Sequence, residues 1–276
     1  MAIKMTSQYI EHLDGTRQYT NVEEKEFYVY NGNHWDPSNG GRCCLWTVPN
    51  GTTSIKFELL SGGGPGGSSG GDYDVGTGGQ GGNYTVKTIT RNVAGFTDGS
   101  QYTICAAGTS DCSCCCSCNM NCRHGCTSFV TGPGLSNFCA IGGMGGSTSW
   151  DVMSGCYNCF IGNVQCSVGN YNAGWVNHVC DTPTYGGDIE FRGTSGSMRR
   201  TQPDCCADIH GTAGSPSGPF AAWHGFSGKH ACTGNWACCS HEAAWPGGGG
   251  GAHITAATDA CWGGFGAGGL VRVTYS

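Results

Sequence analysis

Residues 67–71 read Gly-Ser-Ser-Gly-Gly and match the Gly-x-Ser-x-Gly pattern that presents a nucleophilic serine in hydrolases. That chemistry requires a strand directly before the serine and a helix directly after it. In this chain a glycine tract lies on both sides of the serine, and the nine histidines form no His-Glu-x-x-His motif. Chance within a glycine-rich tract explains the match, so we predict no catalytic residue and no enzyme activity.

Two glycine runs, at residues 62–67 and 76–81, also fit the Gly-x-Gly-x-x-Gly pattern of nucleotide-binding loops. A phosphate site of this kind needs a helix that begins at the loop, because the first amide groups of the helix hold the phosphate. No such helix is predicted after either run. We therefore expect the protein to bind no cofactor.

Twenty-one cysteines could form disulfides or bind metal. Zinc sites use four Cys or His ligands, usually as two close pairs; Cys156 and Cys159 make one such pair, but the cysteines after them lack the standard spacing. Adjacent cysteines such as Cys43 and Cys44 suit bridges to different strands. We favour disulfides and keep metal binding as the alternative, and the odd total leaves at least one thiol unpaired or paired between chains. The disulfide candidates are Cys43, Cys44, Cys105, Cys112, Cys126, Cys156, Cys159, Cys166, Cys180, Cys205, Cys206, Cys232, Cys238, Cys239 and Cys261.

Composition and charge limit where the protein acts and what it contacts. Dense cysteine use points to an oxidising environment, yet the first residues lack the apolar stretch of a secretory signal. We expect export without a signal, as in release by cell lysis, or removal of a signal. The net charge of −6 and the scattered basic residues predict no nucleic-acid binding. No apolar run approaches the roughly 18 residues that span a bilayer, so membrane insertion is not expected.

Alternation of apolar and polar residues predicts the strands that position these groups. In residues 54–59, Ile55, Phe57 and Leu59 alternate with Lys56 and Glu58, as in a strand with one buried and one wet face. A turn at residues 49–51 precedes this strand, and no segment has the pattern of an amphipathic helix. Further strands are predicted at residues 26–30, 45–48, 83–89, 101–106 and 270–275.

Glycine supplies 51 of the 276 residues, and aliphatic residues are too scarce for an ordinary core along the whole chain. Because glycine lacks a Cβ, runs such as 62–67 and 246–251 could pack against each other as polyproline-II-like segments that bury backbone. The alternative is that they are mobile loops. The sequence leaves both open.

The order of these segments resembles the glycine-rich domain of bacteriophage tail-fibre and other virion proteins. The likeness rests on the Trp-Thr-Val-Pro turn at 46–49, the alternating strand and its glycine run, Gly-x-x-Tyr-Thr-Ile at 99–104 and Val-x-Val-x-Tyr at 271–275. It covers about residues 45–108 and 263–276. The resemblance implies an all-β fold, a small jelly-roll-like β-sandwich with glycine-rich loops.

With this resemblance, the chain is expected to divide into two parts. Residues 1–38 carry no cysteine and are expected to be an N-terminal attachment segment or an additional strand. Residues 39–276 form the glycine-rich β domain. A cysteine-rich insertion, residues 109–262, interrupts that domain and is expected to be mostly irregular.

The resemblance implies a non-enzymatic virion protein, either a tail fibre or a capsid surface fibre or decoration, involved in host attachment. Its expected partners are other virion proteins, a host surface glycan or protein, and further copies of the chain in a homo-oligomer. By the same likeness Trp223, Trp236 and Trp245 are candidates for receptor binding. The alternative for these rings is a place in the core, as substitutes for missing Leu and Ile. The alternatives for the protein are a secreted adhesin or matrix protein, or a metal-binding cysteine-rich protein.

Overall fold

The computed structural model describes part of the chain in full and a few further strands by their backbone. The fully described residues are 24–30, 41–66, 78–109, 125–146, 186–194, 196, 215–216, 218–219, 243, 245–250 and 264–276, apart from the side chains at 92 and 94. The strands described by backbone alone are β1 (Lys4–Met5), β2 (Tyr9–Glu11), β3 (Arg17–Tyr19), β11 (Asn158–Ile161), β12 (Val164–Val168), β13 (Trp175–Val179), β14 (Thr184–Tyr185), β16 (Ser197–Arg200) and β17 (Ile209–Thr212).

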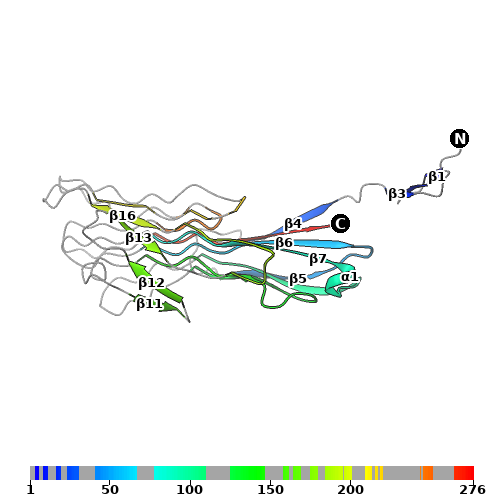
Figure 1. Cartoon of the computed structure of the whole chain (residues 1–276), viewed down its shortest axis with the longest axis horizontal. Helices are drawn as coiled ribbons and strands as arrows, with labels where there is room; N and C mark the ends of the chain where they lie inside the picture. Colours follow the sequence, from blue (N-terminus) through cyan, green and yellow to red (C-terminus); the bar gives the residue numbers. More distant parts are fainter. Residues whose placement is uncertain are drawn as a thin grey trace.

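Two five-stranded antiparallel sheets make up the described core of the fold, which confirms the all-β prediction (Figure 1). The first, here called the β6 sheet, has the order β15 (Ile189–Phe191), β7 (Tyr84–Thr90), β6 (Ser54–Leu60), β18 (Leu270–Tyr275), β4 (Lys25–Tyr30). The second, the β8 sheet, has the order β14, β10 (Cys139–Ala140), β9 (Ser128–Thr131), β8 (Gln101–Ala106), β5 (Arg42–Thr47). Their inner faces pack together in a sandwich-like arrangement. One helical turn, α1 (Arg91–Ala94), follows β7 and ends at Gly95 with φ of 71°.

The core lies between the sheets and is built from alternate residues of each strand. Ile55, Phe57 and Leu59 of β6 are all fully buried, as their alternation predicts. The Phe57 ring lies 5.2 Å from the ring of Tyr102 in β8 and 6.5 Å from that of Phe138. Large aromatic rings thus fill a core that has few aliphatic side chains.

The predicted strands fall within one residue of the observed ones at 54–60, 84–90, 101–106 and 270–275. The structure differs from the prediction at Glu58, which was expected on a wet face but is only 3% exposed. The outer face of the β6 sheet is covered at this point, because the Tyr84 hydroxyl donates a 2.5 Å hydrogen bond to Glu58 and Arg272 lies beside it. Alternation alone does not show what covers the outer face.

Strand β4 comes from the N-terminal part of the chain and forms one edge of the β6 sheet. It pairs with β18 along its whole length, from Lys25 opposite Tyr275 to Tyr30 opposite Leu270. Residues 25–30 are therefore an additional strand of the sandwich, one of the two roles expected for this region.

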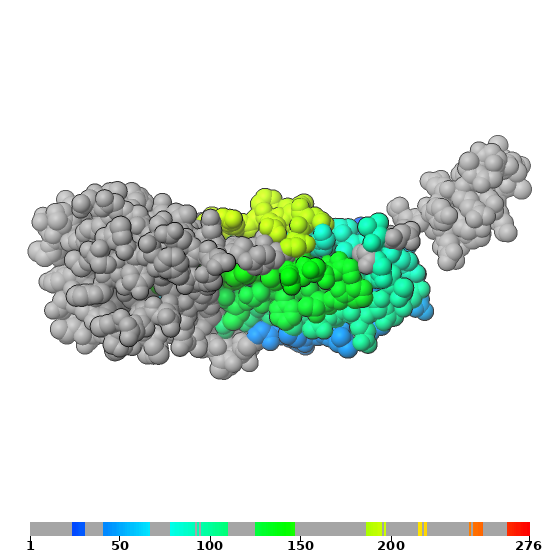
Figure 2. Space-filling model, turned by 60° about the horizontal axis from the view of Figure 1, so that its bottom comes forward, coloured from blue at the N-terminus to red at the C-terminus, as the bar shows by residue number. Residues whose placement is uncertain are grey.

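Residues 109–262, expected to be a mostly irregular insertion, contain short strands. They supply β9, β10 and β14 to the β8 sheet and β15 to the β6 sheet. Figure 2 shows the segment that contains β15 (yellow-green) beside residues 125–146 (green). These strands are short and separated by glycine, so their periodicity in the sequence is weak. In the described part of the chain, no helix is long and apolar enough to cross a membrane.

Candidate functional site

Glycine segments run on from the strands of the sandwich and pack together as a single scaffold. The scaffold comprises residues 61–66 after β6, 78–83 before β7, 141–146 after β10, 247–250, and 264–269 before β18. In Figure 1 the described segments continue the direction of the strands, away from the C-terminus. These residues, 62–66 and 247–250 included, are mostly buried.

Backbone hydrogen bonds join the scaffold segments with a spacing of three residues. The Gly63 amide donates to the Ala267 carbonyl (2.9 Å), and the Gly66 amide donates to the Gly264 carbonyl (2.8 Å). Between them, the Gly64 amide donates to a different segment, at the Gln80 carbonyl (2.8 Å). A polyproline-II helix has three residues per turn, so every third amide points to the same neighbour.

Residues 78–82 follow the same rule. The amides of Gly79 and Gly82 donate to the carbonyls of Gly250 (2.9 Å) and Gly247 (2.6 Å), so both contact one segment. The Gln80 amide, between them, donates to the Met144 carbonyl (2.8 Å). The described glycine segments therefore pack as polyproline-II-like strands, and the alternative of mobile loops does not hold for them.

The scaffold leaves no room for side chains at its closest contacts. An ideal Cβ built on Gly63 would lie less than 3.0 Å from the backbone of Gly248. A Cβ on Gly142 would be equally close to the backbone of Gly125, and a Cβ on Gly250 would be equally close to the backbone of Gly264. Glycine is needed here because only a backbone without a Cβ permits this approach.

Buried polar side chains tie the scaffold to the sandwich. Gln80 donates from Nε2 to the Gly193 carbonyl (3.1 Å) and accepts at Oε1 from the Met144 amide (3.2 Å). Asn83 donates from Nδ2 to the Ile141 carbonyl (2.7 Å) and accepts at Oδ1 from the Gly193 amide (3.0 Å). Neither residue stood out as functional in the sequence: Gln80 interrupts a glycine tract, and Asn83 begins the strand predicted at residues 83–89.

Trp245 is the one receptor-binding candidate among the described residues. It is partly buried and packs on the outer face of the β6 sheet against a cluster of Leu60, Tyr84, Val86 and Leu270. Its ring centroid lies 5.4 Å from that of Tyr30 in β4. Trp223 and Trp236 lie outside the described residues.

Cys43 and Cys105 form a disulfide, as predicted for both cysteines. They lie directly opposite each other on β5 and β8, on the outward side of the strand pair. Cys44, one residue on, points the other way and packs against the core, opposite Ile104. Its thiol is unpaired, so the disulfide expected for Cys44 is not present; burial raises its pKa, although Arg42 acts in the opposite direction.

The other cysteine candidates are placed only in part. The Cys126 thiol lies 3.9 Å from the Thr109 carbonyl oxygen. The backbones of Cys159 and Cys166 lie opposite each other on β11 and β12. Among the described residues no group of three His, Cys, Asp or Glu side chains could hold a metal ion. The remaining candidates lie outside the described residues: Cys112, Cys156, Cys180, Cys205, Cys206, Cys232, Cys238, Cys239 and Cys261.

The described residues thus form an all-β, sandwich-like fold that a glycine scaffold, packed through backbone contacts, continues. A family model described as a glycine-rich domain matches residues 38–276 of this chain. The chain therefore belongs to the glycine-rich domain family. No curated protein matches it.

Proposed function

We propose that this protein is a non-enzymatic virion surface protein, a tail fibre or a capsid surface fibre or decoration, that acts in host attachment. The scaffold is the observation that supports this role. A rigid support that carries several loops at one end is a common arrangement for binding, because binding residues are concentrated on loops that a stiff framework positions.

The hydrogen bonds of the scaffold hold the ends of several of its segments close together. Gly66 donates to Gly264, Gly79 donates to Gly250, and the Gly146 amide donates to the Pro65 carbonyl (2.7 Å). The chain therefore leaves the scaffold at residues 66, 146 and 250, and returns at 78 and 264, within one small region. Segments 67–77 and 251–263 therefore have their ends close together, an arrangement that suits a binding surface built from several segments.

A secreted adhesin or matrix protein is the second candidate. The Cys43–Cys105 disulfide favours an oxidising environment, which both candidates share. They differ in where the protein is found.

Electron microscopy of source material, labelled with gold-conjugated antibody raised against this chain, separates them. Label at the tip of a virion tail supports a fibre, and label spread over the capsid supports a decoration protein. Label on cell surfaces or loose matrix, with virions bare, overturns the virion proposal and favours the adhesin. Adsorption of particles that carry Trp223→Ala and Trp236→Ala, compared with Trp245→Ala, then tests which rings contact the host.

A further inference from the structure

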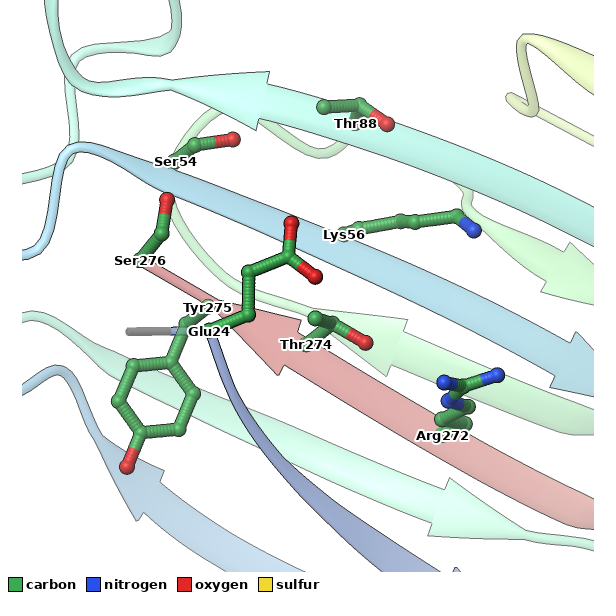
Figure 3. Close-up of a pocket in the computed structure, with 8 residues that line it drawn as sticks. All are labelled: Glu24, Ser54, Lys56, Thr88, Arg272, Thr274, Tyr275 and Ser276. Atoms are coloured by element: carbon green, nitrogen blue, oxygen red, sulfur yellow. The ribbon is translucent and has the colours of Figure 1, made fainter. Parts of the chain in front are cut away.

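A cavity of about 240 Å³ lies on the outer face of the β6 sheet, away from the glycine scaffold (Figure 3). It is lined by Glu24, Ser54, Lys56, Thr88, Arg272, Thr274, Tyr275 and Ser276. In Figure 3 the Tyr275 ring points away from the other side chains. That ring packs in the core, 5.4 Å from Trp46 and 6.5 Å from Phe27, so the cavity wall itself is polar.

Strand register explains why these groups gather. Thr88 of β7 lies opposite Lys56 of β6, and Lys56 lies opposite Thr274 of β18. Residues that are opposite in neighbouring strands point to the same face of a sheet. A row of hydroxyl, ammonium and hydroxyl groups therefore crosses three strands. The carboxylate of Glu24, the residue directly before β4, lies beside this row (Figure 3).

Carboxylates outside the cavity hold its two cationic side chains. The buried Glu58 has its Oε2 atom 3.3 Å from Lys56 Nζ and 3.7 Å from Arg272 Nη1. Glu26 accepts from Arg272 at Nη2 (2.6 Å) and at Nε (3.0 Å). The side chains are thus oriented before any ligand arrives, and ordering them on binding costs less.

The charges around the cavity decide what it can bind. Two cationic groups, Lys56 and Arg272, face three carboxylates, those of Glu24, Glu26 and Glu58. This near balance favours neither an anion such as phosphate or sulfate nor a metal cation. What the cavity offers instead is alternating hydrogen-bond donors and acceptors, which suits a neutral ligand that carries several hydroxyl groups.

We propose that this cavity is a subsite for one neutral sugar ring, held through its hydroxyl groups by Glu24, Lys56, Thr88 and Thr274. Its volume is below the roughly 300–1,000 Å³ of pockets that take larger organic ligands, so a single ring is the expected size. Tyr28, opposite Arg272 on β4 and 43% exposed, lies nearby. The Arg272 guanidinium lies over its ring, 5.9 Å from the ring centroid, and the exposed remainder of the ring would contact the next ring of a longer glycan. The proposal does not depend on where in a virion or cell the protein is found.

The test is a titration of the whole chain, labelled with ¹⁵N, with the methyl glycosides of glucose, galactose, mannose and N-acetylglucosamine at millimolar concentration. We expect at least one sugar to shift the amide signals around Lys56, Thr88 and Thr274, and the binding to be unchanged by added salt, because a neutral ligand is not screened. No shift with any of the four sugars overturns the proposal. Binding of sulfate or phosphate at these amides, weakened by salt, also overturns it in favour of an anion site.

Matched variants separate a sugar site from a general effect on the sheet. Thr88→Val removes a lining hydroxyl, and its control is Thr90→Val, an exposed threonine two residues on in the same strand that does not line the cavity. Glu24→Gln is paired with Glu190→Gln on the exposed edge strand β15. We expect each lining variant to weaken binding by about tenfold, the loss of roughly one hydrogen bond. The control variants should bind the sugar as the wild type does. An equal loss of affinity in both members of a pair contradicts the assignment of the cavity as the sugar subsite.

Discussion

The Tyr84 hydroxyl donates a 2.5 Å hydrogen bond to Oε1 of Glu58, and both residues are only 3% exposed. Glu58 also lies near Lys56 and Arg272, so one buried carboxylate links β7, β6 and β18 on the outer face of the sheet. A buried carboxylate is stable only when neighbouring groups compensate for its lost hydration. Tyr84 supplies the shortest of these contacts.

Removal of that hydroxyl should therefore destabilise the fold. We expect Tyr84→Phe to lower the free energy of unfolding by about 1.5–3 kcal/mol, the usual effect of a hydrogen bond to a charged group. Tyr28→Phe is the control, because the Tyr28 hydroxyl donates to the exposed Glu26 at 3.3 Å. Urea denaturation measures the free energy of unfolding of both variants. Equal losses in the two would show that the Tyr84 hydrogen bond does not stabilise the buried Glu58 carboxylate.

Alkaline pH should also weaken the protein. Burial, followed by the hydrogen bond to Glu58, raises the pKa of Tyr84, and burial raises the pKa of Tyr102 to about 12. Unfolded tyrosines ionise near pH 10, so the stabilisation linked to these raised pKa values is fully present below about pH 10 and is lost as pH rises further. Urea denaturation at a series of pH values checks this. The loss should be smaller in Tyr84→Phe and Tyr102→Phe, and an identical pH dependence in wild type and both variants would contradict it.

The scaffold should not tolerate a methyl group at its closest contacts. Gly63→Ala places a Cβ against the Gly248 backbone, and we expect a loss of about 3 kcal/mol, at the upper end of the usual overpacking cost. The control is Gly99→Ala, where there is open space and only the left-handed φ of 79° opposes a side chain, at about 1–2 kcal/mol. Thermal unfolding of both variants gives the comparison. A smaller loss for Gly63→Ala than for Gly99→Ala would mean that the scaffold is not closely packed.

The Cys43–Cys105 disulfide closes a loop with a sequence separation of 62 residues. On the chain-entropy model, its removal by the double variant Cys43→Ser and Cys105→Ser should cost about 4 kcal/mol. Cys44→Ser keeps the disulfide and is the control, with a smaller loss expected. Unfolding midpoints with and without reductant measure the effect: the wild type should respond to reductant, and lack of any response would argue against the bridge.

Trp245 should act as a structural residue. Because it is partly buried on the cluster of Leu60, Tyr84, Val86 and Leu270, we expect Trp245→Ala to cost about 2 kcal/mol through lost apolar burial. On the proposed attachment role, host adsorption of folded particles should be unaffected at permissive temperature. Strong loss of adsorption with unchanged stability would instead return Trp245 to the receptor-binding candidates.

The sequence by itself determined the all-β class and the main strands, because a period of two in hydrophobicity reports local geometry. Residues 54–59 and 270–275 carried that signal clearly, and glycine content identified the runs at 62–67, 76–81 and 246–251, which overlap three of the scaffold segments. Whether these segments packed or stayed loose was decided only by the tertiary structure, since a glycine run has no side-chain pattern that names its neighbours. The tertiary structure also decided that Cys43, and not its neighbour Cys44, pairs with Cys105, because this choice depends on strand register. The same holds for the cavity around Lys56, whose lining residues come from segments far apart in the chain and meet only when β4, β6, β7 and β18 align.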